Sequence, residues 1–450
     1  MSKDQNIHFV GVGGAGMSAL AQIQAMDQGQ ATGSDRLFDK GGNLGLKAKL
    51  EALGVRLFPQ DGSGVSRQTN LVVLSTAIED DNPEVAAAKG LGVPVMHRSE
   101  LLARHVQEFR TIAVTGTSGK STVAAMIFEI LEAAGRSPSI ITGGSLLTLQ
   151  GRGFYGNAFR GASGLLVIEA DESDGSLVNY RPAVGVFLNL TKDHKEVAVM
   201  RDILLRFRAN VKDVWANGDD PNLAGFQDGG RAFGLDSGEV RAEGLECGPL
   251  QSRCTIPGAE FVLPWPGRHN AANAVAAAAA CIGEGVSLED CRRGLAGCLG
   301  VARRFQSLGK ARGVEVVDDY AHNPAKVAAA LAAAHLRARR VLAVYQPHGF
   351  APTRLLKNEL IAALQAGLGE DDVLWLPDIY YVGGTTSKDI SAKDITQPLS
   401  RAGKRTFHLP DRDAIITEIS REANPGDLVL VMGARDPSLP DFARAILKAL

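Results

Sequence analysis

The stretch Thr115–Thr122, with the sequence TGTSGKST, lies between an apolar run and a long helical pattern. Ile112–Val114 predicts a buried strand, and Val123–Ala134 predicts a buried helix. Glycines at such a junction let backbone N–H groups surround a phosphate at the N-terminus of the helix. Lys120 adds a positive charge there, and the hydroxyl of Ser121 can hold Mg²⁺. The stretch therefore indicates a binding site for a nucleoside triphosphate.

The composition is that of a globular protein. The 450 residues are too many for one core and favour about three domains. The 48 basic and 50 acidic side chains nearly balance, so bulk charge indicates neither nucleic acid nor an anionic membrane as a partner. No apolar run reaches a membrane-spanning length, and the first residues lack the features of a signal peptide. Five cysteines without a Cys-x-x-Cys pair fit reduced thiols, which predicts a cytoplasmic protein.

Strand-like and helix-like segments alternate almost throughout the chain, which predicts an α/β fold with mostly parallel sheets. We divide the chain into three domains, residues 1–107, 108–300 and 301–450. Besides the strand before the phosphate loop, the main strand signals are Ile7–Val12, Leu71–Leu74, Val184–Leu190, Val314–Asp318, Val341–Tyr345, Val373–Leu376 and Leu428–Met432.

The first domain carries a glycine-rich turn between a strand and a helix. The pattern Gly11-x-Gly13-x-x-Gly16 is followed, 19 residues after its last glycine, by Asp35. This is the layout of a dinucleotide-binding turn. A NAD-dependent oxidoreductase is the default interpretation, and a packing turn without a ligand is the alternative. The phosphate loop downstream weighs against hydride transfer, and the diphosphate of a sugar nucleotide would use the same helix N-terminus.

Acidic residues follow an apolar strand of the middle domain. Glu169 ends that strand and begins the run Glu169–Asp174, with the sequence EADESD. Acids at a strand end beside a phosphate loop are where a nucleotide-bound Mg²⁺ is held, with a solvated loop as the alternative. His194 follows another strand, and we interpret it as a ligand of a second metal or a phosphate contact rather than a surface histidine. Asn270 suits the N-cap of a later helix, and Asn273 on the same face can read an adenine edge.

Taken together, these motifs resemble the Mur ligase family. The similarity covers nearly the whole chain and is greatest to the branch that joins L-alanine to UDP-N-acetylmuramate. In the third domain it rests on Arg303–Phe305, Asp318–Pro324 and Tyr345–His348, which fall in the order expected of the family. The resemblance implies a Rossmann-like N-terminal domain, a central ATPase domain of P-loop type with a mostly parallel sheet, and a Rossmann-like C-terminal domain that brings the amino acid.

The resemblance further implies an ATP-dependent amide ligase of peptidoglycan precursor synthesis, with ATP and Mg²⁺ as cofactors. The lactyl carboxylate of UDP-N-acetylmuramate would attack the γ-phosphate, and the amine would then attack the acyl phosphate. The implied catalytic residues are Lys120, Glu169, His194, His322, His348 and Arg354, with Ser121, Glu169 and His194 as metal ligands. The implied ATP-binding residues are Gly116, Thr117, Ser118, Gly119, Lys120, Ser121, Thr122, Asn270, Asn273, Arg304 and Asp319. The implied substrate-binding residues are Gly13, Gly14, Ala15, Gly16, Met17, Ser18, Asp35, Arg36, Ser75, Thr76, Ala77 and Arg98.

The chain departs from the alanine branch where the amino acid should bind. Gly349 and Pro352 stand where that branch usually has arginines. Arg354 lies nearby and is the predicted substitute, because an α-carboxylate prefers a bidentate guanidinium. The alternatives are a related ligase that adds a recycled tripeptide or another amine, a NAD-dependent oxidoreductase and a non-catalytic UDP-sugar sensor. The expected partners are small-molecule substrates, UDP-N-acetylmuramate and an amino acid or short peptide. We expect no nucleic acid, no membrane insertion and a monomer or homodimer.

Overall fold

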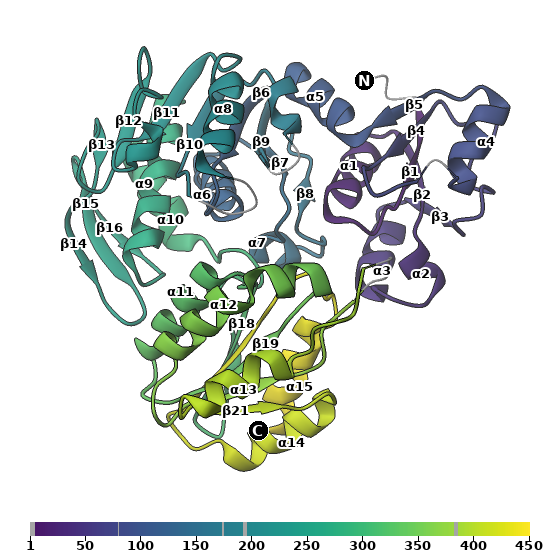
Figure 1. The fold of residues 1–450 in the computed structure, drawn as a ribbon. Coiled ribbons are helices and arrows are strands. Elements are labelled where there is room, and N and C mark those ends of the chain that lie inside the picture. The colour runs from purple at the N-terminus through teal and green to yellow at the C-terminus, as the bar shows by residue number, and fades with distance from the viewer. Residues whose placement is uncertain (1–4, 80, 173–174, 192–195, 382–385) are drawn as a thin grey trace. The chain divides into compact units, whose positions relative to one another are not determined.

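The computed structural model describes residues 5–79, 81–172, 175–191, 196–381 and 386–450 of the chain (Figure 1). Internal contacts divide it into two compact units, Met1–Val301 and Ala302–Leu450. Three large, mostly parallel sheets and one small antiparallel sheet form the frame of these units.

The N-terminal part of the first unit is a five-stranded parallel sheet with the order β3-β2-β1-β4-β5. Its strands are β1 (Asn6–Val10), β2 (Gln30–Ser34), β3 (Arg56–Phe58), β4 (Leu71–Leu74) and β5 (Val95–His97). Its helices are α1 (Ala15–Met26), α2 (Arg36–Asp39), α3 (Leu44–Ala52), α4 (Pro83–Leu91) and α5 (Arg98–Glu108). The predicted strand Ile7–Val12 ends at Val10, because Gly11 adopts a φ of +74° and turns the chain. Strands β2 and β4 flank β1 on opposite sides, and ligands of such sheets bind beyond the carboxyl ends of the strands at this crossover.

The middle of the chain forms an eight-stranded sheet with the order β13-β12-β11-β10-β6-β9-β7-β8, in which β8 runs antiparallel to β7. Its strands are β6 (Arg110–Thr115), β7 (Ser139–Ile141), β8 (Ala158–Phe159), β9 (Leu165–Glu169), β10 (Val184–Phe187), β11 (Asp213–Asn217), β12 (Arg231–Gly234) and β13 (Val240–Arg241). The helices of this region are α6 (Lys120–Ala133), α7 (Leu147–Gly151), α8 (Val197–Arg208), α9 (Arg268–Gly283) and α10 (Leu288–Gly297), with short 3₁₀ turns at Ser176–Asn179 and Pro221–Leu223. A small antiparallel sheet is added by β14 (Glu243–Cys247), β15 (Ser252–Ile256) and β16 (Ala259–Leu263).

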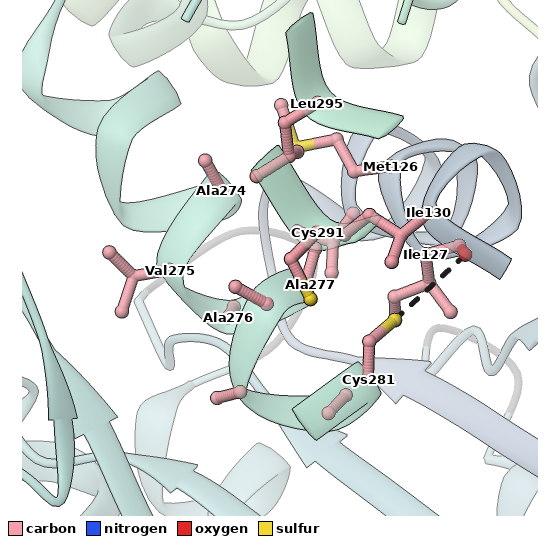
Figure 2. Close-up of a cluster of buried hydrophobic side chains, with 14 of the residues drawn as sticks. Met126, Ile127, Ile130, Ala274, Val275, Ala276, Ala277, Cys281, Cys291 and Leu295 are labelled. Atoms are coloured by element: carbon pink, nitrogen blue, oxygen red, sulfur yellow. Dashed lines mark hydrogen bonds between the residues drawn. The ribbon is translucent and has the colours of Figure 1, made fainter. Parts of the chain in front are cut away.

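Helices α6, α9 and α10 pack closely because α9 presents a nearly continuous surface of alanines (Figure 2). Figure 2 shows Ile127 of α6 facing Cys281 of α9, whose sulfur lies 4.0 Å from the carbonyl oxygen of Ile127. Burial raises the pKa of the neighbouring Cys291 thiol to about 12. These cysteines therefore behave as small apolar side chains, and all five cysteines of the chain are free thiols.

The second unit is a six-stranded sheet with the order β17-β18-β22-β19-β20-β21, parallel except for the edge strand β17. Its strands are β17 (Gln306–Ala311), β18 (Val314–Asp319), β19 (Val341–Gln346), β20 (Val373–Leu376), β21 (Arg405–His408) and β22 (Leu428–Gly433). One apolar cluster covers a face of the sheet with α11 (Pro324–His335), α12 (Phe350–Gly367) and α13 (Lys393–Arg401). A second cluster covers the other face with α14 (Arg412–Glu422) and α15 (Leu439–Ala449).

The predicted α/β class with mostly parallel sheets is therefore confirmed. The predicted domain limits at residues 107 and 300 stay predictions. None of the helices in the described ranges combines the length and the apolar character of a membrane-spanning segment.

The contact between α10 and α6 generates a test of the core. A Cβ atom on Gly294 would lie 2.5 Å from the Cα atom of Ile130, which is backbone and cannot move aside. We expect Gly294→Ala to lower the free energy of unfolding by about 2 kcal/mol, because the added methyl overpacks the helix pair. Urea unfolding measures this. Gly297→Ala in the same helix is the control: its Cβ would meet nothing within 4 Å, and we expect a change below about 0.5 kcal/mol. Equal effects of the two variants would contradict the tight contact.

Candidate functional site

The phosphate loop joins β6 to α6 and takes a shape that requires its glycines. Gly116 and Gly119 have φ angles of +135° and +89°, and Gly119 is the N-cap of α6. A Cβ atom on Gly119 would lie 2.7 Å from the side-chain oxygen of Asn273. The structure thus places Asn273 of α9 against the phosphate loop. Its predicted contact with an adenine edge stays a prediction.

Asn189 fixes the backbone of this loop. Its side-chain oxygen accepts hydrogen bonds of 2.9 Å from the N–H of Ser118 and the hydroxyl of Thr117, and its amide donates to the carbonyl of Ser118 at 2.9 Å. Strand β10 was predicted to reach Leu190 but ends at Phe187, because the residues after it turn toward the loop. Sequence analysis missed Asn189, since this contact joins positions more than 70 residues apart.

Lys120 points back over the loop and is held by a carboxylate. Its ammonium lies 2.9 Å from the carbonyl oxygen of Gly116, 2.7 Å from Glu172 Oε2 and 3.8 Å from Asp171 Oδ1. Burial opposes the charge of this ammonium, but the carboxylates of Glu172, Asp171 and Glu169 outweigh burial and raise the pKa of Lys120. The lysine is therefore charged at neutral pH. Sequence analysis placed Glu172 in the acidic run expected to hold Mg²⁺ but did not predict its ion pair with Lys120.

Ser121 and Glu169, predicted as metal ligands, lie side by side. Glu169 Oε2 accepts hydrogen bonds of 2.9 Å from the hydroxyls of Ser121 and Thr142 and from the N–H of Gly143. A carboxylate and a hydroxyl are oxygen donors of the kind that Mg²⁺ prefers, so these side chains fit the predicted ion. In the described part of the chain, no three His, Cys, Asp or Glu side chains form a metal-binding group. His194, the other predicted ligand, lies outside the described residues.

The start of α9 corrects one prediction. Gly267, with a φ of +96°, occupies the N-cap that sequence analysis assigned to Asn270. Asn270 lies within the first turn, and its amide donates to the carbonyl of Pro266 at 2.8 Å. The prediction was wrong because the preceding glycine can take the backbone angle that begins the helix. The predicted contacts of Asn270 with ATP stay a prediction.

The glycine-rich turn of the N-terminal sheet is shaped by Asp35. One oxygen of Asp35 accepts from the N–H of Gly13 at 2.9 Å, and the other caps α2 by accepting from the N–H of Leu37 at 2.8 Å. A Cβ atom on Gly16 would lie 3.0 Å from the guanidinium of Arg98, so Arg98 lies over the same turn. The loop that holds Ser75–Ala77 follows β4 at the same edge of the sheet.

In the second unit, Asp319 and two histidines lie at the carboxyl edge of the sheet. Asp319 accepts hydrogen bonds from the N–H groups of Phe305 at 2.6 Å and Ala321 at 2.7 Å. Burial raises the pKa of Asp319 to about 6, and the nearby charge of Arg304 only partly opposes this. The rings of His322 and His348 are 5.6 Å apart between centroids. The structure therefore brings these predicted residues of the second unit together.

Arg435 is a residue of this edge that sequence analysis missed. Burial, and then the positive charge of Arg435, lower the pKa of His348 to about 4, so this imidazole is neutral at neutral pH. Arg435 follows β22 and holds a φ of +61°, a strained angle for a residue with a side chain. Arg354, the predicted carboxylate ligand, instead donates to the carbonyl of Ser387 at 3.1 Å and pairs with Asp389. Its predicted role remains untested.

Comparison with known proteins places these features in a family. Residues 6–110 match the model "Mur ligase family, catalytic domain", residues 114–281 the "Mur ligase middle domain", and residues 303–435 the "Mur ligase, glutamate ligase domain". The chain belongs to the Mur ligase family. It is 37% identical to a UDP-N-acetylmuramate–L-alanine ligase from Synechococcus sp. strain RCC307, over 97% of this chain and 94% of the relative. A relative of the same name from Pelotomaculum thermopropionicum is 34% identical, over 97% and 96%.

Solved structures of Mur ligases show the same fold. The UDP-N-acetylmuramate-alanine ligase MurC from Thermotoga maritima matches with a TM-score of 0.81 and 26% identity, covering 98% of each chain. The murein peptide ligase from Psychrobacter arcticus matches with a TM-score of 0.71 and 22% identity, covering 99% of this chain and 98% of that one. The predicted family and the three-domain α/β fold are confirmed. As a Mur ligase the protein is an ATP-dependent enzyme that forms amide bonds, which disfavours the oxidoreductase alternative.

The ion pair between Lys120 and Glu172 generates a test of the site's electrostatics. Both side chains are nearly buried. Lys120→Met removes the lysine ammonium and leaves the Glu172 carboxylate buried without a cationic partner. We expect this variant to lose about 3 kcal/mol of unfolding free energy. The double variant Lys120→Met/Glu172→Gln should recover most of the loss, because it removes the unpaired charge. Urea unfolding measures both variants, and the exposed Lys89→Met is the control. A Lys120→Met protein as stable as wild type would contradict the ion pair.

Proposed function

We propose that this ligase joins L-alanine to the lactyl carboxylate of UDP-N-acetylmuramate, with ATP and Mg²⁺, through an acyl phosphate. The observation that carries the proposal is the 37% identity, over nearly the full length, to a ligase named for this reaction. The product would be a peptidoglycan precursor made in the cytoplasm from small-molecule substrates. A monomeric or homodimeric state stays a prediction.

The charged ammonium of Lys120 at the phosphate loop supports this proposal. The first step brings a carboxylate toward a triphosphate, and two anions approach only where fixed cations and N–H donors face them. Lys120 is charged and bonded to Glu172, and its ammonium would exchange this carboxylate for a phosphate oxygen on ATP binding. Ser121 and Glu169 are the described side chains that would hold Mg²⁺, which when bound draws negative charge from the phosphates.

The second unit supports a site for the amine. His348 is neutral, so its imidazole can accept a hydrogen bond from the ammonium of an amino acid without repelling it. Arg435 is close enough to influence His348, and its guanidinium can bind an α-carboxylate in bidentate fashion. We propose that Arg435 supplies the positive charge that the chain lacks at Gly349 and Pro352. Arg354, bound to Asp389, is the alternative ligand.

Phosphate release from ATP tests the proposed reaction. The assay contains Mg²⁺, UDP-N-acetylmuramate and one amine at a time: L-alanine, glycine, L-serine or the tripeptide L-Ala-γ-D-Glu-diaminopimelate. We expect release with L-alanine and little with the others, and mass spectrometry should detect the alanyl product. Release with the tripeptide alone would make this a recycling ligase. Binding of both nucleotides without turnover, for every amine, would support the sensor alternative instead.

Two arginine variants test the amine site. We expect Arg435→Ala to raise the KM for L-alanine about 10- to 100-fold, because the α-carboxylate loses a charged partner, while the KM for ATP changes little. Arg354→Ala should change the KM for L-alanine less than about threefold. Steady-state kinetics at saturating UDP-N-acetylmuramate measures both. The opposite ranking would make Arg354 the carboxylate ligand, as sequence analysis predicted.

A further inference from the structure

A continuous series of buried and partly buried hydrogen bonds runs through the first unit, from Glu169, the predicted metal ligand, to the glycine-rich turn. It begins at Glu169, whose Oε2 atom accepts the hydroxyl of Thr142 at 2.9 Å. The backbone N–H of Thr142 in turn donates to the carbonyl of Asn157 at 3.0 Å. Thr142 is 3% exposed and Asn157 is 1% exposed, so the bond between these two residues is shielded from water, whereas Glu169 is only partly buried.

The side chain of Asn157 continues the series into α1. Its amide donates to the carbonyl of Ala15 at 2.9 Å and to the hydroxyl of Ser18 at 3.0 Å. Its oxygen accepts from the amide of Gln22 at 2.7 Å, and Gln22 also donates to the carbonyl of Ser18 at 3.0 Å. Ser18 and Gln22 are both 0% exposed. Figure 1 shows α1 beside β8, the short strand that Asn157 precedes.

The location of Asn157 separates it from ordinary contacts between the two sheets. Two of its partners, Ala15 and Ser18, lie in the first turn of α1, at the end that follows the glycine-rich turn, and Gln22 lies one turn further along. Elsewhere on the same boundary the contacts are more exposed: Arg160 pairs with Asp27 at 3.1 Å beyond the last turn of α1. Buried amides are a costly way to join two elements unless a defined geometry is needed, because apolar side chains would bury the same area without directional demands.

We propose that Asn157 is a positioning residue that sets the distance between the glycine-rich turn and Glu169. The inference rests on the proposed function, in which the turn holds the sugar nucleotide and Glu169 belongs to the ATP site. A fixed link between the two sites would keep the attacking carboxylate at a constant distance from the γ-phosphate. A displacement of about 1 Å in such an arrangement can cost about 100-fold in rate.

Kinetics and binding of Asn157→Ala test the proposal. We expect kcat to fall about 10- to 100-fold. The dissociation constants of UDP-N-acetylmuramate and of a non-hydrolysable ATP analogue should stay within about threefold of wild type, measured separately by calorimetry. Each ligand keeps its own loop, because Asp35 still shapes the glycine-rich turn and Asn189 still holds the phosphate loop. A variant with normal kcat would overturn the proposal, and so would a loss of UDP-N-acetylmuramate affinity as large as the loss of kcat, because Asn157 would then act on binding.

Two further variants separate positioning from folding. Asp27→Ala removes the ion pair beyond the other end of α1 and should leave kcat unchanged. Gln22→Met keeps the side-chain volume but removes the hydrogen bond to the Asn157 oxygen, and it should also lower kcat. This variant serves as the test if Asn157→Ala folds poorly. A kcat drop with Asp27→Ala equal to that of Asn157→Ala would overturn a specific role for Asn157.

Amide hydrogen exchange gives a readout that needs no substrate. Asn157→Ala should speed exchange both in the first turn of α1 and at Thr142–Gly144, whereas Asp27→Ala should not. Unchanged exchange would overturn the link. Faster exchange at both places, in a protein whose wild type releases no phosphate with any amine, would keep the link and refute the proposed function instead.

Discussion

The parallel pairing of β6 with β9 and β10 is the constraint on which the candidate site depends. Parallel strands end at the same edge of a sheet, so the residues after three separate strands meet there. The phosphate loop follows β6, Glu169 ends β9, and Asn189 follows β10. Each of these side chains is brought to the loop by strand register alone, before any ligand arrives. The arrangement of the site is therefore a consequence of the sheet.

Much of this arrangement could be predicted from the sequence. The strand–loop–helix junction at the phosphate loop, the pairing of Ser121 with Glu169 and the α/β class all follow from local patterns, because strand ends and helix starts leave strong signals. Strand ends were predicted less accurately. Strand β1 is shorter than predicted because Gly11 turns the chain, and β10 is shorter because the residues after Phe187 bond to the phosphate loop.

The remaining contacts depend on tertiary packing. Asn189, Thr142 and Asn157 look like ordinary loop polar residues until the fold brings a partner to each. The N-cap at Gly267 was missed for another reason. Asparagine is the more common N-cap residue, and the sequence does not reveal the backbone angle that places Gly267 there. Residues that act through distant partners carry no local signal, whereas residues that form a turn or end a strand do.

The burial of the cysteines has a practical consequence. Cys254, Cys281, Cys291 and Cys298 are buried, and Cys247 on the edge strand β14 is exposed. A thiol-reactive fluorophore would therefore attach at one position of the native protein without any cysteine being removed by mutagenesis. A second label placed in the second unit, through one introduced cysteine, would then give a distance reporter between the two units.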